Sequence, residues 1–234
     1  TERGTMTGRR LFAIAAGVLA AGAAAVWLLC YASLPVRDGA LQLSGLQGRV
    51  AVAFDEYGIP SLTAESRLDA FRVLGYVTAQ ERLFQMDLLR RSSAGRLAEI
   101  LGEQAVPLDV RQRRLGFSSV AEQVVRRLPD DQSAVQAAYA DGVNSFLTHM
   151  TMPPFEFLLL GYRPSRWEPT DSVLVVLAMF QMLNGSEDDE RMRTVMTASL
   201  PAEVTAFLLP PLDAYTAQVL RGGSSRQIPT PVPV

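Results

Sequence analysis

The most pronounced hydrophobic feature of the chain is an uncharged run from Leu11 to Ala32. As a helix rising 1.5 Å per residue, this run is about 33 Å long, which is enough to cross a hydrocarbon core. Arg3, Arg9 and Arg10 precede the run, so the positive-inside rule places residues 1–10 in the cytoplasm. We therefore predict a single-pass anchor at 11–32 in the inner (cytoplasmic) membrane, with the remainder on the periplasmic or extracellular side. A signal peptide, cleaved or uncleaved, is the alternative.

Shorter patterns follow this run. Residues 33–48 contain Pro35 and three glycines with little periodicity, which is typical of a tether. Two short apolar stretches, 49–55 and 59–64, flank Glu56-Tyr57-Gly58. This arrangement predicts a strand, a glycine turn and a second strand.

Helical periodicity dominates from Ser66 onward. Ser66 has an acid three residues later, as in a capping box, and apolar residues then recur at spacings of three and four to about Arg91. Pro129-Asp130-Asp131 and Thr170-Asp171 precede two further apolar runs and predict helix starts. The predicted fold class is α+β, mainly α in this chain. Residues 221–234 are rich in Gly, Ser and Pro, as a disordered linker or spacer is.

The amino-acid composition excludes several classes of function. All 22 basic residues are arginine, so a Walker lysine and a Schiff-base lysine are excluded. The single His149 and single Cys30 exclude a two-histidine zinc motif and an intrachain disulfide. His149 is expected at a helix end. With 24 acidic residues and a pI near 5.5, the chain lacks the cationic excess that a nucleic acid partner requires.

Several linked motifs are more specific than composition. Asp55-Glu56-Tyr57-Gly58-Ile59-Pro60 is followed by the segments 75–86 (GYVTAQERLFQM) and 90–99 (RRSSAGRLAE). Three shorter motifs follow in order, at 139–144, 160–164 and 167–171. In sequence and spacing these motifs resemble the penicillin acylase (penicillin amidase) family over about residues 41–215. Arg90 and Arg91 resemble constant parts of the motif, and we expect them to form structural ion pairs.

The resemblance implies an N-terminal-nucleophile hydrolase. In that family a precursor cuts itself into α and β chains, and a serine at the β N-terminus attacks the amide. Its own α-amino group acts as base, which is sensible because such groups have pKa values of about 7.7–8.0. Residues 49–220 correspond to the α subunit, so the expected αββα architecture is completed by a missing β chain. No catalytic residue is expected in this chain, which alone should be inactive.

Two residues are implied in substrate binding. The resemblance places Phe180 and Asn184, about one helical turn apart, at positions that line the acyl pocket. In the alternative interpretation, Phe180 packs in the core and Asn184 ends a helix. Asn184 stands where penicillin G acylases carry an aromatic residue, so a longer aliphatic acyl group fits as well as phenylacetyl.

One residue is implied in metal binding. The resemblance places Glu190 at a ligand to calcium, with the other ligands on the β chain. Calcium takes 6–8 oxygens, so one carboxylate cannot form the site. In the alternative interpretation, the acidic run 187–190 favours a helix N-terminus.

These inferences predict hydrolysis of the amide bond of an acylated β-lactam, an acyl-homoserine lactone or a similar N-acyl compound. Such an activity would serve antibiotic biosynthesis or degradation, or quorum quenching. The main alternative is a non-catalytic, membrane-tethered helical interaction module from a truncated or degenerate gene. A processing chaperone or inhibitor-like spacer is a third possibility, for which the tail is the sole argument.

Overall fold

The computed structural model describes residues 2–184 and 187–209. The chain divides into a first unit that ends at Phe180 and a second that begins at Gln181. The predicted linker at 221–234 lies outside the described residues. Within them the structure is mainly helical with one two-stranded sheet, so the mainly α character of the predicted α+β class is confirmed.

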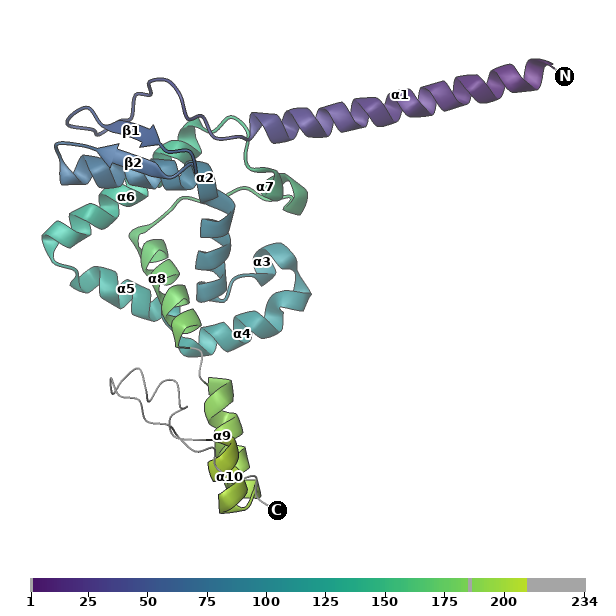
Figure 1. Cartoon of the computed structure of the whole chain (residues 1–234). Coiled ribbons are helices and arrows are strands. Elements are labelled where there is room, and N and C mark those ends of the chain that lie inside the picture. The colour runs from purple at the N-terminus through teal and green to yellow at the C-terminus, as the bar shows by residue number, and fades with distance from the viewer. Residues whose placement is uncertain (1, 185–186, 210–234) are drawn as a thin grey trace, which may run out of the picture. The chain divides into compact units, whose positions relative to one another are not determined.

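Figure 1 shows the elements of the first unit, in which the longest connection is the segment 33–50 between α1 and β1. The strands are β1 (Ala51–Phe54) and β2 (Pro60–Thr63). The helices are α1 (Glu2–Ala32), α2 (Arg67–Ala94), α3 (Ala98–Leu101), the 3₁₀ turn Glu103–Ala105, α4 (Val106–Leu115), α5 (Phe117–Arg127), α6 (Asp130–His149), α7 (Phe155–Leu160) and most of α8 (Pro169–Leu183). The second unit contains α9 (Glu187–Ser199) and α10 (Ala202–Leu208).

Helix α1 contains the predicted apolar run. Its segment Arg10–Ala32 is long and apolar enough to cross a membrane, and its side chains are exposed. A signal sequence near an N-terminus has the same length and composition. The structure therefore confirms a helix of spanning length and leaves its role to experiment.

The predicted strand, turn and strand form an antiparallel hairpin in which Ala51 pairs with Thr63 and Phe54 with Pro60. Asp55 organises the turn, because its Oδ1 accepts the backbone N–H groups of Tyr57 and Ile59 at 2.9 and 2.8 Å. An aspartate in a turn can thus accept backbone N–H groups that have no partner in the two strands.

Helix α2 begins where the sequence predicts, at the N-cap Ser66, whose side chain accepts from the Asp69 N–H at 3.4 Å. The second half of the expected capping box is absent. The buried Asp69 carboxylate instead accepts the backbone N–H groups of Gln47 and Gly48 at 3.0 Å. These bonds hold the end of the predicted tether, 33–48, on α2. They also give partners to two backbone N–H groups that lie outside any strand or helix.

Helix α2 is not straight. Arg82 has non-helical dihedrals (φ −142°, ψ 24°), and Figure 1 shows α2 as two segments that run in different directions. The N-terminal segment packs on α6, and the C-terminal segment carries Asp87, Arg90 and Arg91. The bend thus lies between the half of α2 that packs on α6 and the half that carries these three charged groups, and Leu83 and Met86 of the second half also enter the core.

Two glycines set the closeness of α2 and α6. A Cβ on Gly142 would lie 1.8 Å from the Arg72 carbonyl oxygen, and one on Gly75 would lie 2.2 Å from that of Tyr139. Either approach is far inside van der Waals contact, so only glycine fits at both positions. Beside this crossing lies the larger core cluster: Ala79, Leu83, Met86, Ala140, Val143, Phe157 and Trp167.

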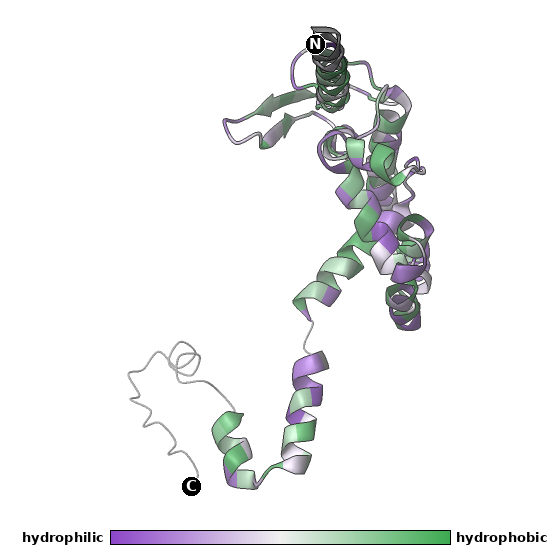
Figure 2. Cartoon of the chain, turned by 90° about the vertical axis from the view of Figure 1, so that its right-hand side faces the viewer, coloured by the Kyte–Doolittle hydropathy of each residue, from purple (hydrophilic) through white to green (hydrophobic). Residues whose placement is uncertain are grey.

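Helix α8 is anchored near its start. Val173 and Leu174 are buried with Ala121 of α5 in a second, smaller core cluster. Apolar residues continue to the C-terminal end of α8, as Figure 2 shows, but Val176 and Met179 there are more than half exposed. The buried contacts of α8 therefore belong to its N-terminal half.

Candidate functional site

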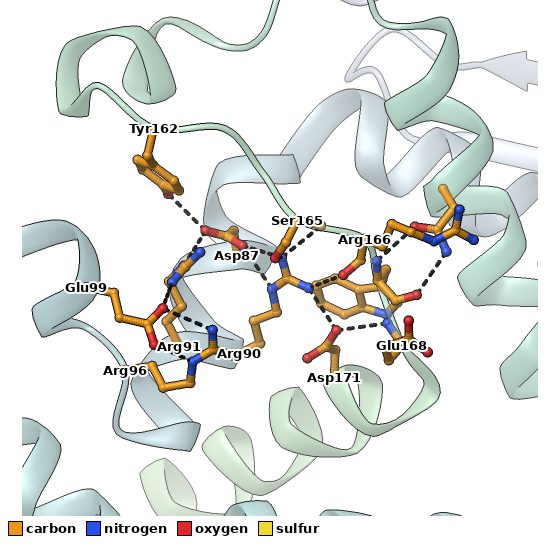
Figure 3. Close-up of polar contacts among 12 residues, drawn as sticks. Asp87, Arg90, Arg91, Arg96, Glu99, Tyr162, Ser165, Arg166, Glu168 and Asp171 are labelled. Atoms are coloured by element: carbon orange, nitrogen blue, oxygen red, sulfur yellow. Dashed lines mark hydrogen bonds and ion pairs between the residues drawn. The ribbon is translucent and has the colours of Figure 1, made fainter.

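The main polar cluster of the first unit is built around Asp87, which is 1% exposed in the C-terminal half of α2 (Figure 3). Its Oδ1 accepts from Arg90 Nε at 2.9 Å and also from Arg90 Nη2. Its Oδ2 accepts from Arg91 Nε at 2.8 Å and from the Tyr162 hydroxyl at 2.9 Å. A buried carboxylate with this number of donors is fully compensated for its loss of water.

Arg90 connects this cluster to the segment that leads into α8. Its Nη1 donates to Asp171 Oδ2 at 2.8 Å and to the Arg166 carbonyl at 2.9 Å. Its Nη2 donates to the carbonyl and the hydroxyl of Ser165 at 3.0 and 2.9 Å. The guanidinium also lies over the Trp167 ring, 5.0 Å from the centroid. All three guanidinium nitrogens of Arg90 therefore donate hydrogen bonds, either to Asp87 on α2 or to residues of the segment 165–171.

Arg91 extends the cluster toward α3. Its Nη1 reaches the Glu99 carboxylate, which also accepts from Arg96 Nε at 2.7 Å. The Arg91 guanidinium lies 5.3 Å from the centroid of the Tyr162 ring. The expectation that Arg90 and Arg91 form structural ion pairs is confirmed.

Two segments near Arg90 are held by reciprocal hydrogen bonds. Asn144 of α6 donates to the Trp167 carbonyl at 2.9 Å and accepts the Trp167 N–H at 2.8 Å. Asp171, at the third position of α8, accepts the Glu168 N–H at 2.8 Å. An acid at this position that bonds back to the N-cap residue is half of a capping box. The helix start predicted at Thr170-Asp171 is confirmed, with Pro169 as first helical residue.

The electrostatics of the cluster exclude proton transfer near neutral pH. Burial opposes ionisation of Asp87, but hydrogen bonds from Arg91 and the charge of Arg90 outweigh it and lower its pKa. Burial, together with the bond to Asp87, raises the pKa of Tyr162 well above its ordinary value. Both groups are moved away from pH 7, whereas a general acid or base works best near it. The cluster is a scaffold.

An apolar cavity of about 300 Å³ lies between α2, α6 and the start of α8. Its lining includes Phe71, Leu74, Met86, Tyr139, Trp167 and Val175. This volume is at the lower end of the range for ligand pockets. The residues predicted for substrate binding do not line it, and no charged side chain does.

Phe180 and Asn184 lie at the end of α8 and just beyond it. Phe180 is 57% exposed, so its side chain is not part of the two core clusters found among the described residues. Asn184 is exposed and follows the last residue of α8, Leu183. Phe180 ends the first unit and Asn184 belongs to the second, so each is described by itself.

Glu190 lies on α9, which begins at Glu187 with the acidic run. The run therefore does begin a helix, as the alternative interpretation expects. Within 2–184 and 187–209, no three His, Cys, Asp or Glu side chains lie together as a metal site requires. The described residues thus do not by themselves fit calcium, whose remaining ligands would have to come from another chain.

Other nucleophiles and bases found in the sequence have structural surroundings. His149 is the last residue of α6, as expected, and its Nδ1 donates to the Ser145 carbonyl at 2.7 Å. Ser93 is buried at the end of α2, and its Oγ has no hydrogen-bond partner among the described residues. A serine without a base is not activated for attack.

Comparison with known proteins identifies the class. The family model for penicillin amidase matches residues 49–226, and the chain belongs to this family. A penicillin acylase 2 proenzyme from Pseudomonas sp. (strain SE83) is 43% identical over 62% of this chain and 19% of its own length. Penicillin G acylase of Escherichia coli is 37% identical over 54% of this chain and 16% of its own length.

Two further matches extend the comparison. The acyl-homoserine lactone acylase QuiP of Pseudomonas aeruginosa is 35% identical over 65% of this chain and 18% of its own length. Among solved structures, a thermostable penicillin G acylase from Alcaligenes faecalis matches with a TM-score of 0.58 and 25% identity, covering 80% of this chain and 97% of the matched chain. The present chain thus spans about a fifth of the length of these curated relatives.

The residues that resemble the family are largely those of the polar scaffold. Arg90, Asn144, Tyr162 and Asp171 all lie in the motifs and all bond across elements. Sequence reasoning missed Asp87, which lies between two motif segments. A signal was present, because Asp87 stands three and four residues before Arg90 and Arg91, the spacing of ion pairs on a helix.

Proposed function

We propose that this chain is the α-subunit part of an acylase that hydrolyses the amide bond of an acylated β-lactam, an acyl-homoserine lactone or a similar N-acyl compound. One observation carries the proposal. Relatives named as penicillin acylases and as an acyl-homoserine lactone acylase match the chain over 132 to 153 residues, which is less than a quarter of each relative's own length.

The chemistry is assigned to a β subunit. The polar cluster around Asp87 supports this division, because its side chains are paired with one another, the pKa of Asp87 is lowered and the pKa of Tyr162 is raised. A serine at the β N-terminus would attack the substrate carbonyl, and its α-amino group would take the hydroxyl proton. The amine would then leave, and water would release the acyl group from the serine.

Phe180 and Asn184 are proposed to contact the acyl group. The 57% exposure of Phe180 supports this role, since an aromatic side chain can contribute a large apolar contact area.

The proposal also includes Glu190 as one ligand to calcium shared with the β subunit. It further includes α1 as the membrane anchor that holds the enzyme outside the cytoplasm.

The proposal is tested with the full precursor, read from the gene beyond the codon for Val234. We expect a serine-initiated segment there and, after processing, release of acyl groups from a panel of penicillins and acyl-homoserine lactones of increasing chain length. Alanine in place of that serine should abolish turnover, and residues 1–234 alone should have none. Hydrolysis by residues 1–234 alone, or a stop codon directly after Val234, would contradict the proposal.

A further inference from the structure

Arg90 links α2 to the segment that leads into α8, in addition to the apolar contacts that Val173, Leu174 and Val175 of α8 make in the two core clusters. From α2 it bonds to Ser165, Arg166 and Asp171, which are 75 to 81 residues further along the chain. The side chain is 7% exposed, so solvent does not weaken these bonds. The planar guanidinium fork fixes direction as well as distance, which an ammonium group does not.

Asp171 receives this contact inside the first turn of α8. It accepts both the Arg90 guanidinium and the Glu168 N–H, each at 2.8 Å. One carboxylate therefore defines where α8 starts and ties that start to α2 (Figure 3). The buried apolar contacts of α8, made by Val173 and Leu174, follow within three residues.

The far end of α8 carries Phe180. It lies nine residues beyond Asp171, or about 13.5 Å along a helix. A tilt of about 10° at the start would move this end by about 2 Å, and a misplacement of about 1 Å in a binding site costs up to a hundredfold in rate. The direction that α8 takes at Asp171, together with the packing of Val173 and Leu174, therefore affects where the Phe180 side chain lies.

We propose that Arg90 is a positioning residue that sets the acyl-group specificity of the enzyme by fixing the direction of α8. The inference rests on the proposed function, because it gives Phe180 a place in the acyl pocket. Arg90 itself touches no substrate; it acts through Asp171. The same cluster that stabilises the fold would thus also determine which acyl chains fit.

The test compares Arg90→Lys and Asp171→Asn with the wild-type precursor and with Arg126→Lys. Arg126 is a matched control, since it forms an exposed ion pair with Glu122 at 3.5 Å on α5. Active sites are counted by titration, so that misfolded enzyme does not enter the kinetic constants. kcat and KM are then measured for acyl chains of several lengths.

We expect Arg90→Lys and Asp171→Asn to raise KM and to change the ratio of kcat/KM between short and long acyl chains by about tenfold or more per titrated site. Arg126→Lys should leave both unchanged. A purely structural Arg90 would lower the number of active sites and leave the ratio as in the wild type. That result would overturn the inference.

A second measurement keeps the two proposals distinguishable. Hydrogen exchange in residues 1–234 should become at least tenfold faster for the amides of residues 172–180 in Arg90→Lys, while those of α6 remain protected. An inactive wild-type precursor would refute the proposed function and leave this measurement standing. Unchanged exchange in α8 would refute the role of Arg90 whether or not the enzyme is active.

Discussion

At the scale of the single residue, Asp87 is the central charged group of the first unit. Its carboxylate is the shared acceptor of Arg90, Arg91 and Tyr162, and it is buried. Removing one partner from a buried cluster leaves the opposite charges uncompensated, at a cost of about 3–5 kcal/mol. The stability of the first unit should therefore depend strongly on the ionisation of this one group.

Asp87→Asn should lower the free energy of unfolding by about 3–5 kcal/mol at pH 7. Because the pKa of Asp87 is lowered in the folded state, its contribution is present above the unfolded value of about 3.9 and is lost as pH falls through the folded pKa. The difference between wild type and variant, from urea denaturation, should thus shrink below about pH 4. A difference that stays constant down to pH 2 would contradict the assignment.

At the scale of the element, the contact of α2 with α6 depends on two residues without side chains. Gly142 approaches the Arg72 carbonyl and Gly75 approaches that of Tyr139, so each glycine faces the backbone of the opposite helix. Helix propensity alone favours alanine over glycine by about 1 kcal/mol. For a glycine-to-alanine substitution at either position, helix propensity therefore predicts higher stability, whereas packing predicts lower stability.

Gly142→Ala should destabilise the chain by about 1–3 kcal/mol or more, since the new Cβ has no space unless the helices separate. Thermal unfolding followed by circular dichroism measures the effect. Gly48→Ala is the control: its Cβ would have no atom within 4 Å, and it should change stability by less than about 0.5 kcal/mol. A stabilised Gly142→Ala variant would show that the helices are not in this close contact.

At the scale of the whole molecule, large apolar side chains are exposed in both units. In the first unit they include Leu159 and Phe180, and in the second Met182 and Leu183, each more than half exposed. Where such side chains lie next to one another within a unit, they favour a surface that another polypeptide covers. The proposed β subunit supplies such a polypeptide.

Residues 33–234, which lack α1, should therefore bind a hydrophobic dye such as anilinonaphthalene sulfonate, and dye fluorescence should fall when the β subunit is present. Omitting α1 removes the helix that, among the described residues, is long and apolar enough for a membrane to cover it. A monomer that melts cooperatively and binds no dye would count against the two-chain arrangement.

The sequence by itself determined the elements with clear periodicity and the family. Two short apolar stretches around a glycine turn located the hairpin, and helical patterns with start signals at Ser66, Pro129 and Thr170-Asp171 located α2, α6 and α8. The helices α3, α4 and α7 were not predicted, because a few turns contain too few apolar positions to define a period. Helix α5 was also missed, although Phe117, Val120, Ala121, Val124 and Val125 recur at helical spacing. The pairing of Arg90 and Arg91 was predicted in kind, but their partners at Tyr162 and Asp171 were not.

Tertiary structure alone decided those partners. Asp69 has the sequence position of a capping residue, yet it bonds to Gln47 and Gly48 because the chain returns to it there. Phe180 has the sequence environment of a core residue, yet it is exposed because the covering contacts of α8 end near Leu177. Periodicity encodes which face of an element avoids water; which distant group meets a charge or covers a face depends on how the elements approach in space.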